Sequence, residues 1–378
     1  MLFRSDLHDR HHRLSPRSAQ RQLRDSSGSK KHDAVERHNP RCHHRIRQIR
    51  NGRGTADSRH RWRSLRSSWP RAQDNTDPAM INRRTFLTTS AAFGVTLAAF
   101  PRNAFSAADT VITILHTNDT HSQIDPLPAN DRNAGKGGVA RRATLVKRIR
   151  KENPNTLLVD AGDVLQGTPY FNFYKGEVEY KAMSAIGYDV GTLGNHEFDN
   201  GVEALAAALK FATFDIVSAN YDVTGTALEG RVKRYVVKTV GGIRIGLFGL
   251  GISPTALITP ANFKGVTFID PVIAARDVVK KLREEERCAL VVCVSHLGYH
   301  EDNQKGNSFV ASQIDGIDFI ASGHTHLFME KPVSQTQPCG ARTLIFEVGK
   351  SGIYVGRVDF TFRGGKLAAA SGRLLRDV

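Results

Sequence analysis

The amino-acid sequence predicts an α/β fold built on parallel or mixed sheets, and two observations support that prediction. From Asp109 onward, short apolar runs typical of buried strands alternate with longer stretches of helical periodicity. Polar side chains suited to metal binding or acid–base chemistry directly follow several of these apolar runs. Because ligands of α/β sheets bind beyond the carboxyl ends of the strands, we expect these side chains to form one site.

Charge is distributed unevenly along the 378 residues. Residues 1–79 carry 19 Lys/Arg against 8 Asp/Glu and lack apolar periodicity, so we expect a disordered basic segment. This segment is either a nucleic-acid-binding tail or not a native part of the protein, in which case translation starts at Met80. Residues 109–378 carry 31 Lys/Arg against 29 Asp/Glu, and we expect one domain there that does not itself bind nucleic acid.

Residues 80–108 have the pattern of an export signal. Arg83 and Arg84 precede an uncharged run from Phe86 to Phe100, and small residues follow Pro101. The run is too short, and too rich in Ser, Thr and Ala, for a membrane-spanning helix. The segment resembles a twin-arginine (Tat) signal peptide, which implies a bacterial protein exported by the Tat translocon to the periplasm or the medium. The alternative is a buried N-terminal helix.

The first half of residues 109–378 is predicted to alternate strands with amphipathic helices. The strands are apolar runs rich in β-branched residues, and the helices carry apolar side chains on one face. The predicted strands are Val111–Leu115, Thr156–Val159, Tyr188–Leu193 and Asp215–Ser218. The predicted helices are Gly137–Lys151, Gly176–Ile186 and Val202–Phe211.

The second half is predicted to begin with a hairpin within Val236–Leu250 that turns at Gly241 and Gly242. A helix over Pro271–Glu286 and two buried strands, Ala289–Val294 and Ile317–Ala321, follow it. Two further runs are predicted to close the domain as an antiparallel pair of strands, Thr343–Val348 and Ile353–Phe362.

Imidazoles, carboxylates and one amide follow five of the predicted strands and form the candidate site. No pair of cysteines has CxxC spacing, and this nitrogen and oxygen ligand set suits two first-row divalent cations in a hydrolase. Each motif alone is weak, because Asp-x-His pairs are common and Gly-Asp is usually a turn. Five of the seven histidines after residue 108 nevertheless lie in these loops. The residues are Asp119, His121, Asp163, Asn195, His196, His296, His324 and His326.

Five motifs in this order resemble those of the calcineurin-like metallophosphoesterases, and in particular the catalytic domain of the bacterial 5′-nucleotidases. They are HTNDTH (116–121), GDVLQGTPY (162–170), GNHEFDNG (194–201), SHLG (295–298) and GHTH (323–326). The resemblance covers residues 109–378. It implies a four-layer α/β/β/α sandwich of two mixed sheets.

The resemblance also implies roles for single residues. His196 would contact the phosphate near the leaving oxygen. Asp199 would orient the imidazole of His196 and favour its charged form. Asp163 would bridge two divalent ions such as Mn, Zn or Fe. One ion would be held by Asp119, His121, Asp163 and His326, and the other by Asp163, Asn195, His296 and His324. Two such ions, two carboxylates and a bridging hydroxide leave a net positive charge, which suits a phosphomonoester dianion.

We therefore expect an exported metal-dependent hydrolase that uses metal-bound hydroxide on small phosphomonoesters, with nucleoside 5′-monophosphates as the first candidates. The alternatives within the family are a 2′,3′-cyclic phosphodiesterase, a UDP-sugar hydrolase and a related sulfur-ester hydrolase. A binding module that keeps the fold without the chemistry is the non-enzyme alternative, and the intact ligand set disfavours it. The family's second domain, which stacks the base, has no match in this sequence, so we expect no base recognition by that route.

Overall fold

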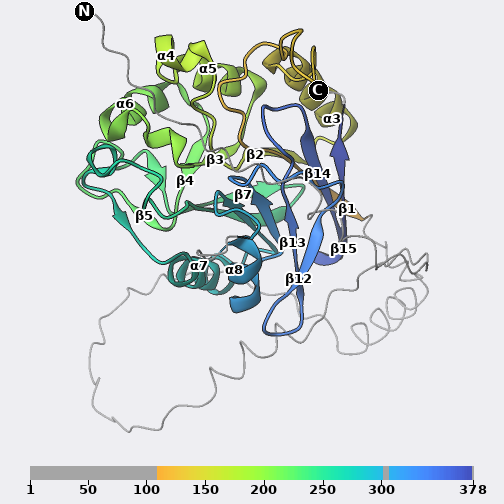
Figure 1. The fold of residues 1–378 in the computed structure, drawn as a ribbon. Helices are drawn as coiled ribbons and strands as arrows, with labels where there is room; N and C mark the ends of the chain where they lie inside the picture. Colours follow the sequence, from red (N-terminus) through yellow and green to blue (C-terminus); the bar gives the residue numbers. More distant parts are fainter. Residues whose placement is uncertain (1–108, 301–305, 377–378) are drawn as a thin grey trace, which may run out of the picture. The chain divides into compact units, whose positions relative to one another are not determined.

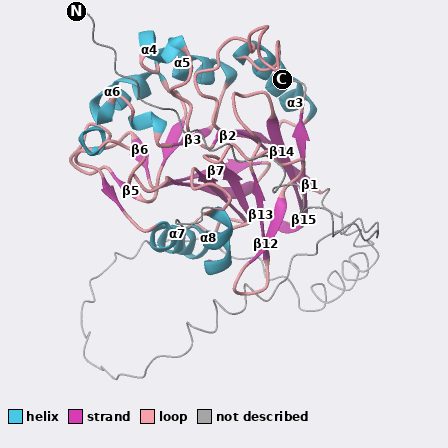
Figure 2. Cartoon of the chain, viewed as in Figure 1, coloured by secondary structure: helices cyan, strands magenta, loops and turns pink. Residues whose placement is uncertain are grey.

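The computed structural model describes residues 109–300 and 306–376. The predicted basic segment and the predicted export signal lie outside these residues. Two sheets dominate the described part of the chain (Figures 1 and 2). One has seven strands in the order β15-β14-β1-β2-β3-β4-β6, the other has six in the order β12-β13-β11-β10-β8-β7, and β5 and β9 form a short ribbon.

The seven-stranded sheet is mixed, because its core strands run parallel and one edge is antiparallel. The neighbours β1, β2, β3, β4 and β6 run parallel, whereas β14 pairs antiparallel with both β1 and β15. Its strands are β1 (Thr110–Thr117), β2 (Thr156–Asp160), β3 (Val190–Thr192), β4 (Asp215–Val217), β6 (Val232–Lys233), β14 (Val355–Arg363) and β15 (Lys366–Leu375).

The six-stranded sheet is also mixed. Its centre, β8-β10-β11-β13, is parallel, and the edge strands β7 and β12 are antiparallel to their neighbours. Its strands are β7 (Tyr235–Val240), β8 (Ile243–Leu250), β10 (Leu290–Ser295), β11 (Phe319–Ser322), β12 (Val333–Thr336) and β13 (Arg342–Phe346). The ribbon consists of β5 (Tyr221–Asp222) and β9 (Thr267–Phe268).

Helices cover the outer face of each sheet. Those near the seven-stranded sheet are α3 (Val139–Glu152), α4 (Pro169–Tyr174), α5 (Glu177–Ile186) and α6 (Gly201–Ala208). Those on the six-stranded sheet are α7 (Pro271–Lys280) and α8 (Asn307–Gln313). Short helical turns complete the described elements: η2 (His196–Phe198), η3 (Leu209–Phe211), η4 (Pro260–Phe263) and the π-helical η5 (Lys281–Glu285).

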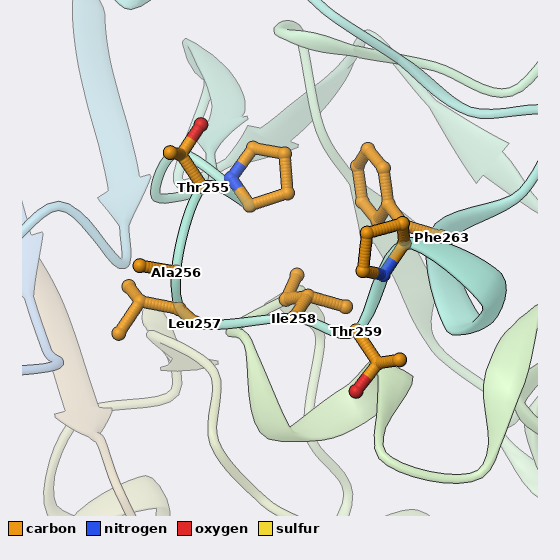
Figure 3. Close-up of a pocket in the computed structure, with 8 residues that line it drawn as sticks. Thr255, Ala256, Leu257, Ile258, Thr259 and Phe263 are labelled. Atoms are coloured by element: carbon orange, nitrogen blue, oxygen red, sulfur yellow. The ribbon is translucent and has the colours of Figure 1, made fainter.

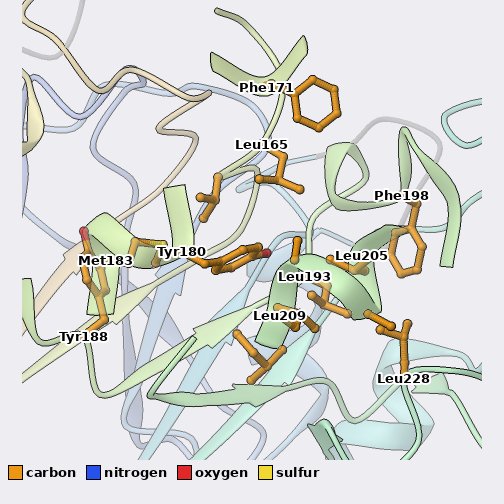
Figure 4. Packing of buried hydrophobic residues seen from close by; sticks show 14 of the residues in the cluster. Leu165, Phe171, Tyr180, Met183, Tyr188, Leu193, Phe198, Leu205, Leu209 and Leu228 are labelled. Atoms are coloured by element: carbon orange, nitrogen blue, oxygen red, sulfur yellow. The ribbon is translucent and has the colours of Figure 1, made fainter. Parts of the chain in front are cut away.

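Three buried clusters separate four layers. Tyr180 of α5 and Leu205 of α6 belong to the cluster between the helices and the seven-stranded sheet (Figure 4). Ile114 of β1 and Val292 of β10 belong to the cluster between the two sheets. In the third, Val278 of α7 packs with residues of β10 and α8. This layering confirms the predicted α/β/β/α sandwich, because each sheet buries apolar side chains on both faces.

Local patterns predicted most of the regular elements. The hairpin of β7 and β8 turns at Gly241 and Gly242, whose φ angles of 56° and 76° favour glycine. The predicted antiparallel pair at the end of the domain is wrong, because β13 and β14 belong to different sheets. The intervening segment crosses from one sheet to the other, and the N–H of Ser351 donates to the carbonyl of Asp119 at 2.7 Å on the way.

Candidate metal centre

Five parallel strands deliver the candidate residues to one edge of the two sheets. Asp119 and His121 follow β1, and Asp163 follows β2. Asn195 and His196 follow β3, whereas the remaining three histidines follow the parallel strands β10 and β11 of the other sheet. The structure therefore brings all eight candidate loop residues to the carboxyl ends of their strands, as the sequence predicted.

Several of these residues have left-handed backbone conformations. The φ angles are 50° at Asp119, 48° at His121, 53° at Asp163, 91° at His324 and 54° at His326. Such conformations are rare for residues other than glycine and cost about 1–3 kcal/mol each, so surrounding contacts must maintain them. Backbone hydrogen bonds between the loops do so, since the N–H groups of Asp119 and His121 donate to the carbonyls of Gly162 and Asp163 at 2.9 and 3.0 Å.

One group of potential metal ligands consists of Asp119, His121 and His326, whose ligand atoms all lie within 4.8 Å of one another. The Nε2 atoms of His121 and His326 are 3.0 Å apart. The Oδ1 atom of Asp119 lies 3.4 Å from Nε2 of His326 and 3.9 Å from Nε2 of His121. The backbone N–H of His324 donates to Oδ2 of Asp119 at 3.0 Å and fixes that carboxylate.

A second group consists of Asp163, His296 and His324, with Asn195 beside it. The Nε2 atom of His296 lies 3.1 Å from Oδ2 of Asp163. The Oδ1 atom of Asn195 lies 3.1 Å from Nδ1 of His324. The two groups adjoin, because Oδ1 of Asp119 lies 4.0 Å from Nε2 of His296.

The ring of His296 is oriented as a metal-binding imidazole would be. Its Nδ1 atom lies 2.7 Å from the carbonyl oxygen of Ala161, which can only accept, so Nδ1 donates a proton to it and Nε2 is left as the atom that would bind a metal. Nε2 is buried and makes no hydrogen bond of good geometry among the described residues, although Oδ2 of Asp163 lies 3.1 Å from it. A Cβ atom on Gly194 would lie only 2.7 Å from Nε2 of His296, so glycine keeps this space open.

These features fit divalent cations. Imidazole nitrogens, carboxylate oxygens and one amide oxygen converge from both sheets, and the buried Nε2 atom of His296 points into the space between them. Burial alone would lower the pKa of His296, but the adjacent Asp163 and Asp119 carboxylates raise that pKa to about 10. The carboxylates thus favour a positive charge in the site, and a bound cation would supply that charge.

His196 lies beside both groups but belongs to neither. Its Nδ1 atom is 2.8 Å from Oδ2 of Asp199, and the centroid of its ring is 5.4 Å from that of His121. The hydrogen bond with Asp199 raises the pKa of His196, and the negative charge of Asp163 raises it further. Partial burial of the ring lowers the pKa and opposes these two effects. The side chain of His196 is 32% exposed, so it can reach a substrate from solvent.

Glu197 organises two of the loops. Its buried carboxylate accepts hydrogen bonds from the backbone N–H groups of Asp163, Val164 and Gly194 at 3.0, 2.8 and 2.6 Å. Burial raises the pKa of Glu197 to about 7, and the charge of Asp163 contributes to this rise. Glu197 therefore ties the loop of Asp163 to the segment that carries Asn195 and His196.

Sequence reasoning missed a second organising carboxylate, Glu347. This fully buried residue accepts hydrogen bonds from the hydroxyls of Ser322 and Thr325 at 2.7 and 2.8 Å and from the N–H of Leu327 at 2.8 Å. These three residues flank or separate His324 and His326. No motif marks Glu347, because it lies just beyond β13, far along the chain from the loop that it holds.

His116 of the first motif and the aromatic segment of α4 lie outside the two ligand groups. His116 is buried between the sheets against Phe319 and Phe346, with ring centroids 5.8 and 5.2 Å away, and burial lowers its pKa to about 3. In the aromatic segment of α4, Phe171 is buried, but Phe173 is 80% exposed. The helix α4 therefore presents only one of its faces to the protein.

The chain belongs to the calcineurin-like phosphoesterase family, whose pattern it matches over residues 112–328. Members of this family are phosphoesterases, and the two ligand groups are of the kind that could hold divalent metals. Protein UshA of Yersinia enterocolitica is 32% identical over 78% of this chain and 57% of its own length. The 5′-nucleotidase of Bos taurus is 37% identical over 61% of this chain and 41% of its own length.

A crystal structure of a 5′-nucleotidase precursor from Thermus thermophilus is also similar. Its TM-score is 0.64 at 35% sequence identity, over 71% of this chain and 54% of that chain. The chain thus spans about half the length of these relatives. Within residues 109–300 and 306–376, none of the helices is both long and apolar enough to cross a lipid bilayer.

Proposed function

We propose that the protein is a two-metal phosphomonoesterase that acts on nucleoside 5′-monophosphates. The arrangement that supports this proposal best is the pair of adjoining ligand groups with the His196–Asp199 pair beside them. Asp119, His121, Asp163 and His326 would hold one divalent ion, and Asp163, Asn195, His296 and His324 the other. When bound, two such ions would activate water at neutral pH and neutralise phosphoryl oxygens.

The residues of the chain supply the rest of the reaction. His196, charged by Asp199, lies where it can bind a phosphoryl oxygen and donate a proton to the ester oxygen that leaves. Water adds a hydroxyl group to phosphorus, the P–O bond to the alcohol breaks, and the alcohol takes the proton. Asn195 and the backbone around Asp163 remain fixed during these steps, because Glu197 holds that backbone.

Nucleotides are the proposed substrates because two of the relatives described above are 5′-nucleotidases by name. The test is phosphate release by the full chain with added Mn²⁺ or Zn²⁺ from AMP, glycerol phosphate, a 2′,3′-cyclic nucleotide and a UDP-sugar. The proposal expects AMP to be hydrolysed with the highest kcat/KM and a chelator to abolish the activity. Faster hydrolysis of the cyclic nucleotide or the UDP-sugar would contradict the proposal and indicate that other activity instead.

We also propose export through the twin-arginine pathway, with translation starting at Met80 and the mature domain beginning near residue 109. Arg83 and Arg84, ahead of an uncharged run, motivate this proposal. Because this pathway carries folded proteins, the metals could be bound before export. Replacing both arginines by lysine should trap the precursor in the cytoplasm. Undiminished appearance of the double variant in the periplasm would contradict the proposal.

A further inference from the structure

An open pocket of about 650 Å³ lies in the loop after β8 (Figure 3). The loop curves around the pocket, with Thr255 and Ala256 on one side and Phe263 on the other. Among the described residues, the side chains that line it are apolar except for two threonine hydroxyls, and none of them is charged. The lining residues are Pro254, Thr255, Ala256, Leu257, Ile258, Thr259, Pro260 and Phe263.

The loop leaves the sheet at the edge that carries the candidate metal centre. It follows Leu250, the last residue of β8, whose strand runs parallel to β10. The N–H of His296 donates to the carbonyl of Leu250 at 2.7 Å. The first residues of the loop therefore lie next to the strand end that delivers His296.

The far end of the loop is attached to the segment of His196 and Asp199. The side-chain amide of Asn262 donates to the carbonyl of Asp199 at 2.8 Å. The ring of Phe263, which lines the pocket, packs edge-on against Phe198 with centroids 4.8 Å apart. The pocket loop thus extends from the strand that precedes His296 to the segment of His196, which is proposed to protonate the leaving oxygen.

The loop is held in place before any ligand binds. The side chain of Asn220 pairs with both the N–H and the carbonyl of Gly251, at 2.7 Å each. The hydroxyl of Tyr221 donates to the carbonyl of Ile252 at 2.5 Å. Ile258 is buried beneath the pocket, whereas Leu257 is 41% exposed and free to contact a ligand. A preformed pocket of this kind loses little conformational entropy on binding.

We propose that this pocket is the leaving-group subsite and that it holds the apolar, ring-containing alcohol part of a phosphomonoester. The inference rests on the proposed function, because it takes His196 to face the ester oxygen. Beyond that oxygen lies the organic part of the substrate, and the pocket adjoins the His196–Asp199 segment. Apolar walls favour a nucleoside or an aryl group over a polyol, and the described lining residues include no cation that would favour a second phosphate.

The decisive measurement compares kcat/KM for AMP, naphthyl phosphate and glycerol phosphate in the full chain and in Leu257→Ala. Truncating an exposed contact residue leaves the fold intact and removes part of the apolar wall. We expect kcat/KM to fall about five- to tenfold for the two ring-containing substrates, and to stay within about twofold for glycerol phosphate. Ile273→Ala is the matched control, since Ile273 is 62% exposed on α7 and does not line the pocket.

A second variant fills the pocket instead of opening it. Thr255→Trp places a large ring at an exposed lining position and should raise KM for AMP and naphthyl phosphate more than for glycerol phosphate. Equal losses on all three substrates in both variants would show a general disturbance and overturn the subsite. Unchanged kinetics in both variants would overturn it as well.

Adenosine binding, measured by calorimetry, separates failure of the subsite from failure of the proposed function. Adenosine has no phosphoryl group, so its binding does not depend on the metals. If the wild-type chain hydrolyses no phosphomonoester but binds adenosine more tightly than Leu257→Ala does, the subsite stands and the proposed function fails. If the wild-type chain hydrolyses glycerol phosphate but both forms bind adenosine equally, or neither binds it, the subsite is wrong.

Discussion

The Nε2 atom of His296 lies 3.1 Å from Oδ2 of Asp163, and both side chains are almost completely buried. These residues come from different sheets, since Asp163 follows β2 and His296 follows β10. A buried imidazole and a buried carboxylate at this distance join the two halves of the sandwich. The same contact belongs to the second ligand group, in which Asp163 is the carboxylate.

The first prediction concerns Asp163. Asp163→Ala should abolish activity and remove both ions, because this residue is proposed to bridge them. His121→Ala should instead leave the second ligand group occupied, since His121 belongs only to the first. Elemental analysis of the purified variants after dialysis measures both outcomes. Two tightly bound ions in Asp163→Ala would refute the bridging assignment.

The second prediction concerns His196 as a proton donor. His196→Ala should keep its metal and lose about 10²–10⁴-fold in rate on AMP, the usual contribution of general acid catalysis. The loss should be smaller on nitrophenyl phosphate, whose leaving group needs no proton. Metal content and kcat on both substrates are the measurements. Equal losses on the two substrates would count against a role at the leaving oxygen.

The third prediction concerns the pH dependence that Asp199 imposes. The hydrogen bond that Nδ1 of His196 donates to the Asp199 carboxylate raises the pKa of His196, so the charged imidazole persists to a higher pH than usual. An acid of this kind is active below its pKa and loses activity as the pH rises through it. Asp199→Asn should therefore move the alkaline limb of the kcat profile to lower pH. If the alkaline limb measured with AMP did not move in Asp199→Asn, another titrating group would have to be responsible for it.

The fourth prediction concerns Glu347, which holds the loop of His324 and His326. Glu347→Leu has a similar volume but leaves the Thr325 hydroxyl and the Leu327 N–H without their acceptor. Loss of such outer partners typically lowers metal affinity about 10- to 100-fold. Competition with a chelator should reveal this loss, and activity should partly return at high Mn²⁺.

The matched control for Glu347 is Asp318→Asn. Asp318 is another buried carboxylate of the six-stranded sheet, and it accepts hydrogen bonds from Arg283 and from the N–H of Val291 at 2.5 and 2.7 Å. It precedes β11, at the end opposite to the metal loops. This variant should lower the melting temperature yet keep its metal affinity. If both variants lost metal equally, the effect of Glu347→Leu would reflect general destabilisation.

The sequence predicted those parts of the fold that depend on local pattern. Apolar runs identified the central strands, and the Gly241–Gly242 pair identified the hairpin of β7 and β8. It did not predict that β13 and β14 belong to different sheets, because strand partners are chosen by packing across the sandwich. It also missed β15, which begins after the turn at Gly364 and Gly365 and whose small and polar residues are only half-buried at the sheet edge.

The candidate site was predictable for a related reason. Its residues stand in short motifs directly after strands, and parallel strands bring their carboxyl ends together. Glu347 and the loop 254–263 could not be predicted in this way. Glu347 acts through hydrogen bonds to residues about twenty positions earlier in the chain, and the loop carries no catalytic residue type. Their roles depend on tertiary contacts that no single motif encodes.

The last prediction is that the protein discriminates little among the four common nucleobases. In the proposed reaction, the metal ligands and His196 would contact the phosphoryl group and the ester oxygen, which all nucleotides share. Among the described residues that line it, the pocket of residues 254–263 offers apolar walls and two hydroxyls, from Thr255 and Thr259. Sites that read a base must present hydrogen-bonding groups to it, and such sites reject a wrong partner by about 10⁴–10⁵-fold, whereas apolar pockets discriminate far less. We therefore expect kcat/KM for AMP, GMP, CMP and UMP to agree within about tenfold.

A preference of more than about a hundredfold for one base would contradict this expectation. Thr255→Val and Thr259→Val would then show whether those hydroxyls read the base, because loss of the preference in either variant would locate the contact.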